Sequence, residues 1–164
     1  MTNRYWVGGT GTWDTTTTHW SASSGGGAGA TAPTAADSAF FDQAGTYTVT
    51  LTGALACLDI TISAGTVAFT STGTLAISGS MSLSTTTAWN ATGRITFNAT
   101  TSKTITSNNR NVAAPITFNG VGGTWVLSDA LTIDAVTSGA VTLTNGTLNL
   151  NGCLLYTSPS PRDS

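Results

Sequence analysis

The charged side chains between residues 46 and 152 are the groups that could carry out an enzymatic reaction. They are three carboxylates and three cations: Asp59, Asp129 and Asp134, with Arg94, Lys103 and Arg110. Hydrolysis of a glycosidic bond needs two carboxyl groups that face each other, and a lyase needs a base beside a cation. Asp129 and Asp134 flank one short segment, and Arg94 and Arg110 do not follow the repeat of the chain. We therefore expect isolated, solvated charges, no catalytic residue and a protein that is not an enzyme.

The sequence also gives no indication of a metal site or a cofactor site. His19 is the single histidine, and without a cysteine or carboxylate at ligand spacing we expect it to pack rather than to bind a metal. The glycines near Gly8 have no strand before them and no helix after them, which argues against a phosphate loop. Cys57 and Cys153 are the two cysteines, and the second lies in an anomalous tail. We predict no cofactor, no metal and no intrachain disulfide.

Three tryptophans at regular spacing are the remaining candidates for a site. Trp6, Trp13 and Trp20 recur at equal intervals in a segment that is otherwise rich in Gly, Thr and Ser. Large aromatic rings contribute strongly to a buried core, and exposed rings form platforms for sugars. We expect the three rings to form a hydrophobic cap, with a stacking platform for a surface glycan as the alternative.

The composition predicts an all-β protein with an uncharged surface. Of the 164 residues, 40% are apolar and only 7% are charged, no Glu occurs, and Thr makes up about a fifth of the chain. Threonine is β-branched and favours strands, whereas the residues that cover exposed helices are nearly missing. The net charge of −2 is not clustered, so nucleic acid is not an expected partner. No apolar stretch is long enough to predict membrane insertion.

Residues 46–152 show the alternation of short strands, and the pieces repeat. Pairs of apolar residues two positions apart are separated by Gly or Asn turns, as in Leu75 with Ile77, and the other positions are Thr, Ser or Asn. "ITFN" occurs at 95–98 and again at 116–119, and similar strand pairs return every 15 to 21 residues, which suits one coil of a solenoid. This spacing predicts a right-handed parallel β-helix, or β-solenoid, in which Asn98 and Asn119 stack as an amide ladder. An antiparallel β-sandwich is the alternative.

Residues 1–45 differ and predict a cap segment for the solenoid. Eight residues of this segment follow a recognisable pattern: Trp6, Gly8, Gly9, Gly11, Trp13, Trp20, Pro33 and Asp37. The pattern resembles the opening segment of β-helical surface and adhesin-like proteins, including autotransporter-type passengers, domains of the G8 type and uncharacterised structural proteins of bacteriophages. The resemblance covers most of residues 4–152 and implies a shared architecture more than a shared activity.

The last twelve residues are unlike the rest of the chain. "CLLYTSPSPRD" at 153–163 resembles the in-frame translation of a transposon-end adapter used in sequencing libraries. We interpret residues 153–164 as adapter-derived and leave them out of the fold prediction. On that interpretation the solenoid is truncated at Gly152, its last coil has an unpaired edge, and the chain alone should self-associate.

Together these observations predict a non-enzymatic structural repeat protein. A component of a phage virion, such as a fibre or tail-associated protein, is the first hypothesis, because no classical signal peptide follows Met1. A bacterial surface adhesin or autotransporter-like passenger is the second. The third is a non-catalytic N-terminal part of a β-helical polysaccharide-processing enzyme. The expected partners are further copies of the chain or other structural proteins, and a surface glycan.

Overall fold

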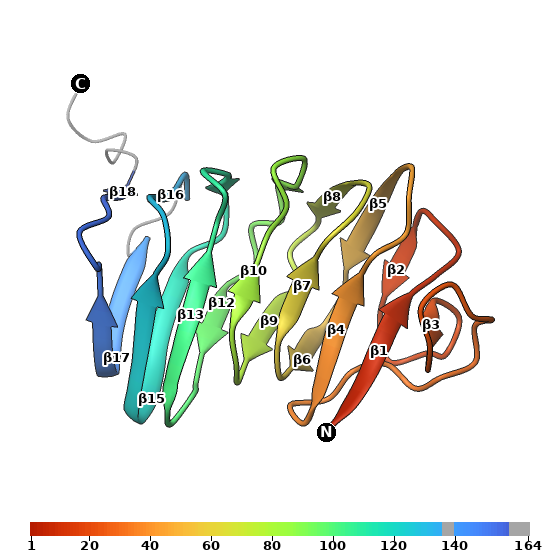
Figure 1. Ribbon diagram of the computed structural model, residues 1–164, viewed down its shortest axis with the longest axis horizontal. Coiled ribbons are helices and arrows are strands. Elements are labelled where there is room, and N and C mark those ends of the chain that lie inside the picture. Colours follow the sequence, from red (N-terminus) through yellow and green to blue (C-terminus); the bar gives the residue numbers. More distant parts are fainter. Residues whose placement is uncertain (136–139, 158–164) are drawn as a thin grey trace.

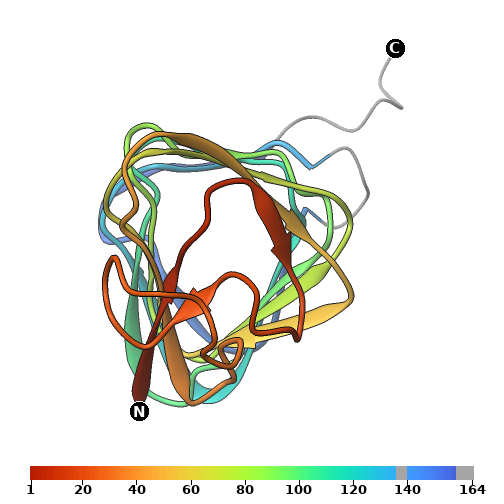
Figure 2. The same cartoon turned by 90° about the vertical axis from the view of Figure 1, so that its right-hand side faces the viewer.

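The chain winds into a right-handed parallel β-helix. The computed structural model describes residues 1–135 and 140–157, in which all regular structure is β-strand. The strands stack side by side along one long axis (Figure 1). Seen from the N-terminal end, the chain turns clockwise as it recedes from the viewer (Figure 2), which makes the coil right-handed. The prediction of a solenoid is thereby confirmed, and the alternative of a β-sandwich is wrong.

Each coil contributes strands to three sides, which we call sides A, B and C. The strands of side A are β1 (Thr2–Trp6), β4 (Asp37–Phe41), β7 (Ile60–Ile62), β10 (Met81–Ser82), β13 (Ser102–Thr106) and the second halves of β15 (Ile116–Leu127) and β17 (Val141–Asn149). Side B holds β2 (Gly11–Trp13), β5 (Thr46–Leu51), β8 (Thr66–Thr70), β11 (Ala88–Trp89), β14 (Asn111–Val112), β16 (Leu131–Ile133) and β18 (Leu155–Thr157). Side C holds β6 (Ala54–Cys57), β9 (Thr74–Ile77), β12 (Ile95–Phe97) and the first halves of β15 and β17 (Val141–Asn149). Because β15 bends round a corner, sides A and C form one continuous sheet.

The register between coils shows that the sequence echo is one turn of the helix. Ile95 pairs with Ile116, and Phe97 pairs with Phe118, in adjacent parallel strands. One of the shortest coil steps runs from Thr46 to Thr66. Some other steps are longer than the sequence echo predicts, as from Met81 to Ile105, because extra residues enter at the turns between strands.

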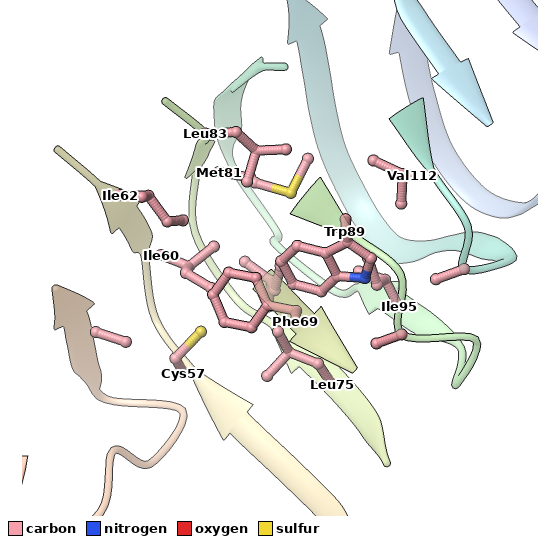
Figure 3. Packing of buried hydrophobic residues seen from close by; sticks show 14 of the residues in the cluster. Cys57, Ile60, Ile62, Phe69, Leu75, Met81, Leu83, Trp89, Ile95 and Val112 are labelled. Atoms are coloured by element: carbon pink, nitrogen blue, oxygen red, sulfur yellow. The ribbon is translucent and has the colours of Figure 1, made fainter. Parts of the chain in front are cut away.

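The interior is filled by the apolar member of each alternation. Pairs such as Leu75 with Ile77 are fully buried, while the Ala position between them points outward and is half-exposed. Figure 3 shows this packing, in which Phe69 lies against Trp89 of the next coil with ring centroids 4.5 Å apart. A single core therefore runs along the axis, and each coil is covered by its neighbours.

The N-terminal end of this core is closed by the chain itself. Thr2 pairs with Asp37, a step much longer than one regular coil, because the segment between β2 and β4 leaves the coil. This segment crosses the end of the helix (Figure 2) and includes β3 (Trp20–Ser21), which pairs antiparallel with β1. Side A then continues directly from β1 to β4 and β7, so coil stacking starts before residue 46.

The other end of the described chain is open. Within the described residues, β17 and β18 each pair with a strand on one side only. Leu143 and Leu150, which belong to apolar pairs of the alternation, are 51% and 38% exposed because no coil covers them. Residues 153–157 of the anomalous tail include β18, which continues side B from β16. Residues 158–164, on which most of the adapter interpretation falls, lie outside the described residues.

Glycines at one corner allow the coils to approach each other. Gly73 and Gly93 precede β9 and β12 and stack one coil apart. A Cβ atom at Gly73 would lie 2.5 Å from the carbonyl carbon of Leu51, and one at Gly93 would overlap the carbonyl oxygens of Gly73 and Thr72. The corner therefore has no room for a side chain, because the atoms in the way belong to the backbone.

We expect Gly93→Ala to lower the free energy of unfolding by about 2 kcal/mol or more, since the corner must shift to relieve the overlap. Gly27→Ala is the matched control, because a Cβ atom there meets nothing within 4 Å and its φ is negative or extended. Urea unfolding followed by tryptophan fluorescence measures both variants. Equal stability of the two variants would contradict the close approach at this corner.

Candidate functional site

A tryptophan cap closes the N-terminal end, where Trp20, from the segment that crosses this end, packs on Trp6 and Trp13, the buried residues of the first coil. Trp6, Trp13 and Trp20 have 0%, 0% and 1% of their surface exposed. Trp20 lies edge-on to both of the others, with ring centroids 5.3 Å from Trp6 and 5.1 Å from Trp13, and all three surround Phe41 of the next coil. None of these rings presents a face to solvent, as a stacking platform for a sugar would require.

His19 belongs to the same cap. Its imidazole is stacked on the Trp6 indole with centroids 4.7 Å apart, and its Nδ1 lies 2.9 Å from the carbonyl oxygen of Val7. Gly11 lies so close to the ring that a Cβ atom there would overlap it. The expectation that His19 packs is therefore confirmed. In residues 1–135 and 140–157 no three His, Cys, Asp or Glu side chains gather as a metal site would require.

The two cysteines lie in different parts of the solenoid, and both are free. Cys57 is buried in β6, whereas Cys153 is partly exposed near the open end. Burial raises the pKa of the Cys57 thiol, which keeps it in the unreactive thiol form. Cys57 therefore serves as a small apolar residue of the core.

Asp59 ties three coils together at the corner between sides C and A. Its carboxylate accepts a hydrogen bond from the Ser38 hydroxyl (2.9 Å) in the preceding coil and one from the Ser80 amide (2.8 Å) in the following coil. Gly79 lies beneath this carboxylate, and a Cβ atom there would overlap it. Asp59 is half-buried, so the prediction of an isolated solvated charge is wrong for this residue.

Asp37, the last residue of the pattern in the opening segment, closes a turn before β4. Its Oδ2 accepts hydrogen bonds from the hydroxyl (2.7 Å) and the amide (3.2 Å) of Thr34. The backbone amide of Asp37 donates a hydrogen bond to the Thr34 carbonyl (2.9 Å). The bond from the Thr34 hydroxyl is the main reason that the pKa of Asp37 lies below its usual value. Asp37 thus positions the strand that starts the second coil.

Asp129 performs a similar task at the turn before β14. Its carboxylate accepts hydrogen bonds from the amide and the hydroxyl of Ser107 (both 2.8 Å) and from the Asn108 amide. The Asn108 side chain donates to the Leu83 carbonyl (2.6 Å) on the other side. This turn is therefore fixed to the coil before it and to the coil after it. The prediction of an isolated charge is wrong for Asp129 as well.

The other charges of this region are spread over the solenoid. Arg94 donates from Nη1 to the Thr117 hydroxyl (2.7 Å), Lys103 lies in β13, and Asp134 follows β16. Asn119 accepts an amide hydrogen bond from Asn145 (2.7 Å) in the next coil. The predicted amide bond between Asn98 and Asn119 does not form among the described residues. The hydrogen bonds that Asp59 and Asp129 accept likewise come from hydroxyls and amides, and they stabilise the stack of coils.

Hollows on the described surface include two that could serve as binding sites. One, of about 370 Å³, lies beside the cap, where Asp42 and Gln43 face the loop of Ser24, Gly25 and Gly26. The other is a groove of about 320 Å³ on side B, between β11 and the turn before β14. Arg110 and three asparagines line this groove: Asn90, Asn109 and Asn111. Arg110 can be picked out in the sequence as a cation, but its neighbour Asn90 comes from a different coil and has no link to it along the chain.

Comparison of the chain with protein-family models, with curated proteins and with solved structures gave no match. The described residues also contain no helix with the length and apolar character of a membrane span.

Several polar atoms of the core have no hydrogen-bond partner among the described residues. They are the hydroxyl of Tyr47 and the indole nitrogens of Trp13, Trp20, Trp89 and Trp125. A buried polar group without a partner lowers stability. For Tyr47, burial raises the pKa to about 12, and the negative charge of Asp42 adds to this effect.

We expect Tyr47→Phe to raise the free energy of unfolding by about 1 kcal/mol at pH 8, because it removes the unpaired hydroxyl. In the wild type, ionisation of Tyr47 does not affect the free energy of unfolding below the unfolded pKa of about 10. Above that pH the unfolded chain loses the Tyr47 proton more readily than the folded chain, so the free energy of unfolding falls as pH rises towards 12. Tyr47→Phe should therefore lose less stability than the wild type between pH 9 and 11. Cys57 leaves a residual dependence, since its pKa is also raised.

Urea unfolding at pH 8 and at pH 11 measures these differences. Tyr5→Phe is the control, because the Tyr5 hydroxyl accepts a hydrogen bond from Asn3 and is partly exposed. A Tyr47→Phe variant that is less stable than the wild type at pH 8 would show that the hydroxyl has a partner in solution.

Proposed function

We propose that the chain is a non-enzymatic structural protein, a solenoid component of a phage virion such as a fibre or tail-associated protein. The observation that supports this proposal is that acidic side chains bind neighbouring coils to one another. Asp59 and Asp129 each hold neighbouring coils together through hydrogen bonds at the corners. Carboxylates placed in this way stabilise a rod, and catalysis of glycoside cleavage would require them to face each other.

The surface of the solenoid supports the same role. Its outward positions carry Thr, Ser and Asn, and its core is continuous from the cap to the last coil. Parallel ladders along the whole axis give a stiff, elongated element (Figure 1). The resemblance of the opening segment to phage structural and adhesin-like proteins favours an assembly or surface context. We therefore place the chain in the virion, with the bacterial cell surface as the competing location.

Mass spectrometry of fractionated source material tests the location. Trypsin should release the peptides ITFNATTSK (95–103) and TITSNNR (104–110). We expect both peptides in virus particles purified on a density gradient, at a constant ratio to the capsid protein. Washed cell envelopes from the same material serve as the comparison fraction. Enrichment of the peptides in the envelopes, and not in the particles, would favour the adhesin and reject the virion proposal.

We further propose that copies of the chain associate through the open end. Leu143 and Leu154 are 51% and 57% exposed there, beside the free edges of β17 and β18, and free strand edges promote pairing between chains. Light scattering of the full chain should therefore show species larger than the monomer at high concentration. We expect Leu143→Lys to increase the monomer fraction several-fold through charge repulsion.

Val121→Lys is the matched control for this experiment. Val121 is 75% exposed but lies at the bend of β15, one strand in from the free edge of β17. The control should associate as the wild type does. A wild-type chain that stays monomeric at high concentration, or equal effects of the two lysine variants, would contradict association through this end.

A further inference from the structure

The groove on side B combines a cation with several amides at the boundary of two coils. Asn90 follows β11 in one coil, while Asn109, Arg110 and Asn111 come from the turn and from β14 in the next. The three asparagine side chains are exposed, Arg110 is half-exposed, and the buried residue Trp89 lies at the base of the groove. Amides can both donate and accept hydrogen bonds, so the groove offers mixed donors and acceptors around one positive charge.

The turn that carries Arg110 is held in one conformation. Asn108 and Asn109 both have positive φ angles, 51° and 56°, which asparagine tolerates better than most residues. The Arg110 amide closes the turn on the Ser107 carbonyl (3.1 Å), and Asp129 holds the Ser107 and Asn108 amides from the next coil. Arg110 is thus presented on a scaffold that loses little conformational entropy when a ligand binds.

The guanidinium of Arg110 uses only one of its nitrogen atoms in a hydrogen bond with the described residues. Its Nε donates a long hydrogen bond to the Asn108 carbonyl (3.4 Å). Its two Nη atoms make no hydrogen bond or ion pair with the described part of the chain. The carboxylate of Asp129, which holds the same turn, is occupied by the amides and hydroxyl that it accepts. The paired Nη donors therefore remain available at the groove.

We propose that this groove binds a carboxylate-bearing saccharide, such as a chain of uronic acids. The two Nη atoms would hold the carboxylate in the bidentate geometry that arginine favours. Asn90, Asn109 and Asn111 would exchange hydrogen bonds with the ring hydroxyls beside it. The volume of about 320 Å³ is sufficient for one or two sugar rings. The inference is independent of the virion proposal, because the groove would bind the same ligand at a cell surface.

Isothermal titration calorimetry with tetragalacturonate tests this site, and its methyl ester is the matched uncharged ligand. We expect the full chain to bind the acid, and to bind the ester at least tenfold more weakly. Arg110→Gln should weaken binding of the acid at least tenfold, as loss of a charge-assisted hydrogen-bonded pair requires. Arg94→Gln is the control, since it removes the same charge at the Thr117 contact outside the groove and should bind as the wild type does.

Inorganic phosphate tests whether any anion suffices. We expect phosphate to compete only weakly, because it offers no ring hydroxyls to the asparagines. Asn90→Asp gives a second variant, in which a negative charge beside Arg110 should also reduce binding of the acid. Circular dichroism confirms that each variant is folded. The proposal is overturned if the wild type does not bind the acid, if acid and ester bind equally, if Arg110→Gln binds as the wild type does, or if phosphate competes as well as the sugar acid.

Discussion

The hydrogen-bond ladder between successive coils is the interaction on which the rest of this structure depends. A single coil of about 20 residues buries too few side chains to offset the loss of conformational entropy on ordering its backbone. Stacking supplies a neighbour above and below for each strand, as in the bond from the Ile60 amide to the Ser80 carbonyl (3.0 Å). The backbone amides and carbonyls on both edges of every coil need hydrogen-bond partners. Each corner and each end of the solenoid must therefore supply them where the ladder does not.

The corners show how the chain meets this constraint. Gly73 and Gly93 let the backbones approach where a side chain would keep them apart, while Asp59 and Asp129 accept the amide donors that the turns leave without a ladder partner. At the N-terminal end, the tryptophan cap covers the core that the first coil would expose. Asp37, Asp59 and Asp129 thus perform structural tasks at turns and corners, whereas Arg110 has unused donors at a groove.

Much of the architecture could be predicted because it has a local signature. Alternation of apolar and polar residues identifies strands, and the echo of Ile95–Phe97 in Ile116–Phe118 marks residues that do stack in register. The tasks of Asp59 and Asp129 could not be predicted in the same way. Each binds residues of a neighbouring coil, at turns whose length varies from coil to coil. The groove was missed for the same reason, since Asn90 and Arg110 meet only when two coils are in register.

The sequence by itself determined the type of element, the direction in which side chains point and the repeat that brings strands together. These properties depend on the alternation within each strand and on the period of the coils, and both can be read along the chain. The tertiary structure alone decided which turns carry insertions, which coils share a carboxylate, and that Trp6, Trp13 and Trp20 are fully buried. The physical reason is that a side chain's surroundings in a solenoid are set by the coils above and below it, and the exact step between them depends on the geometry of every corner.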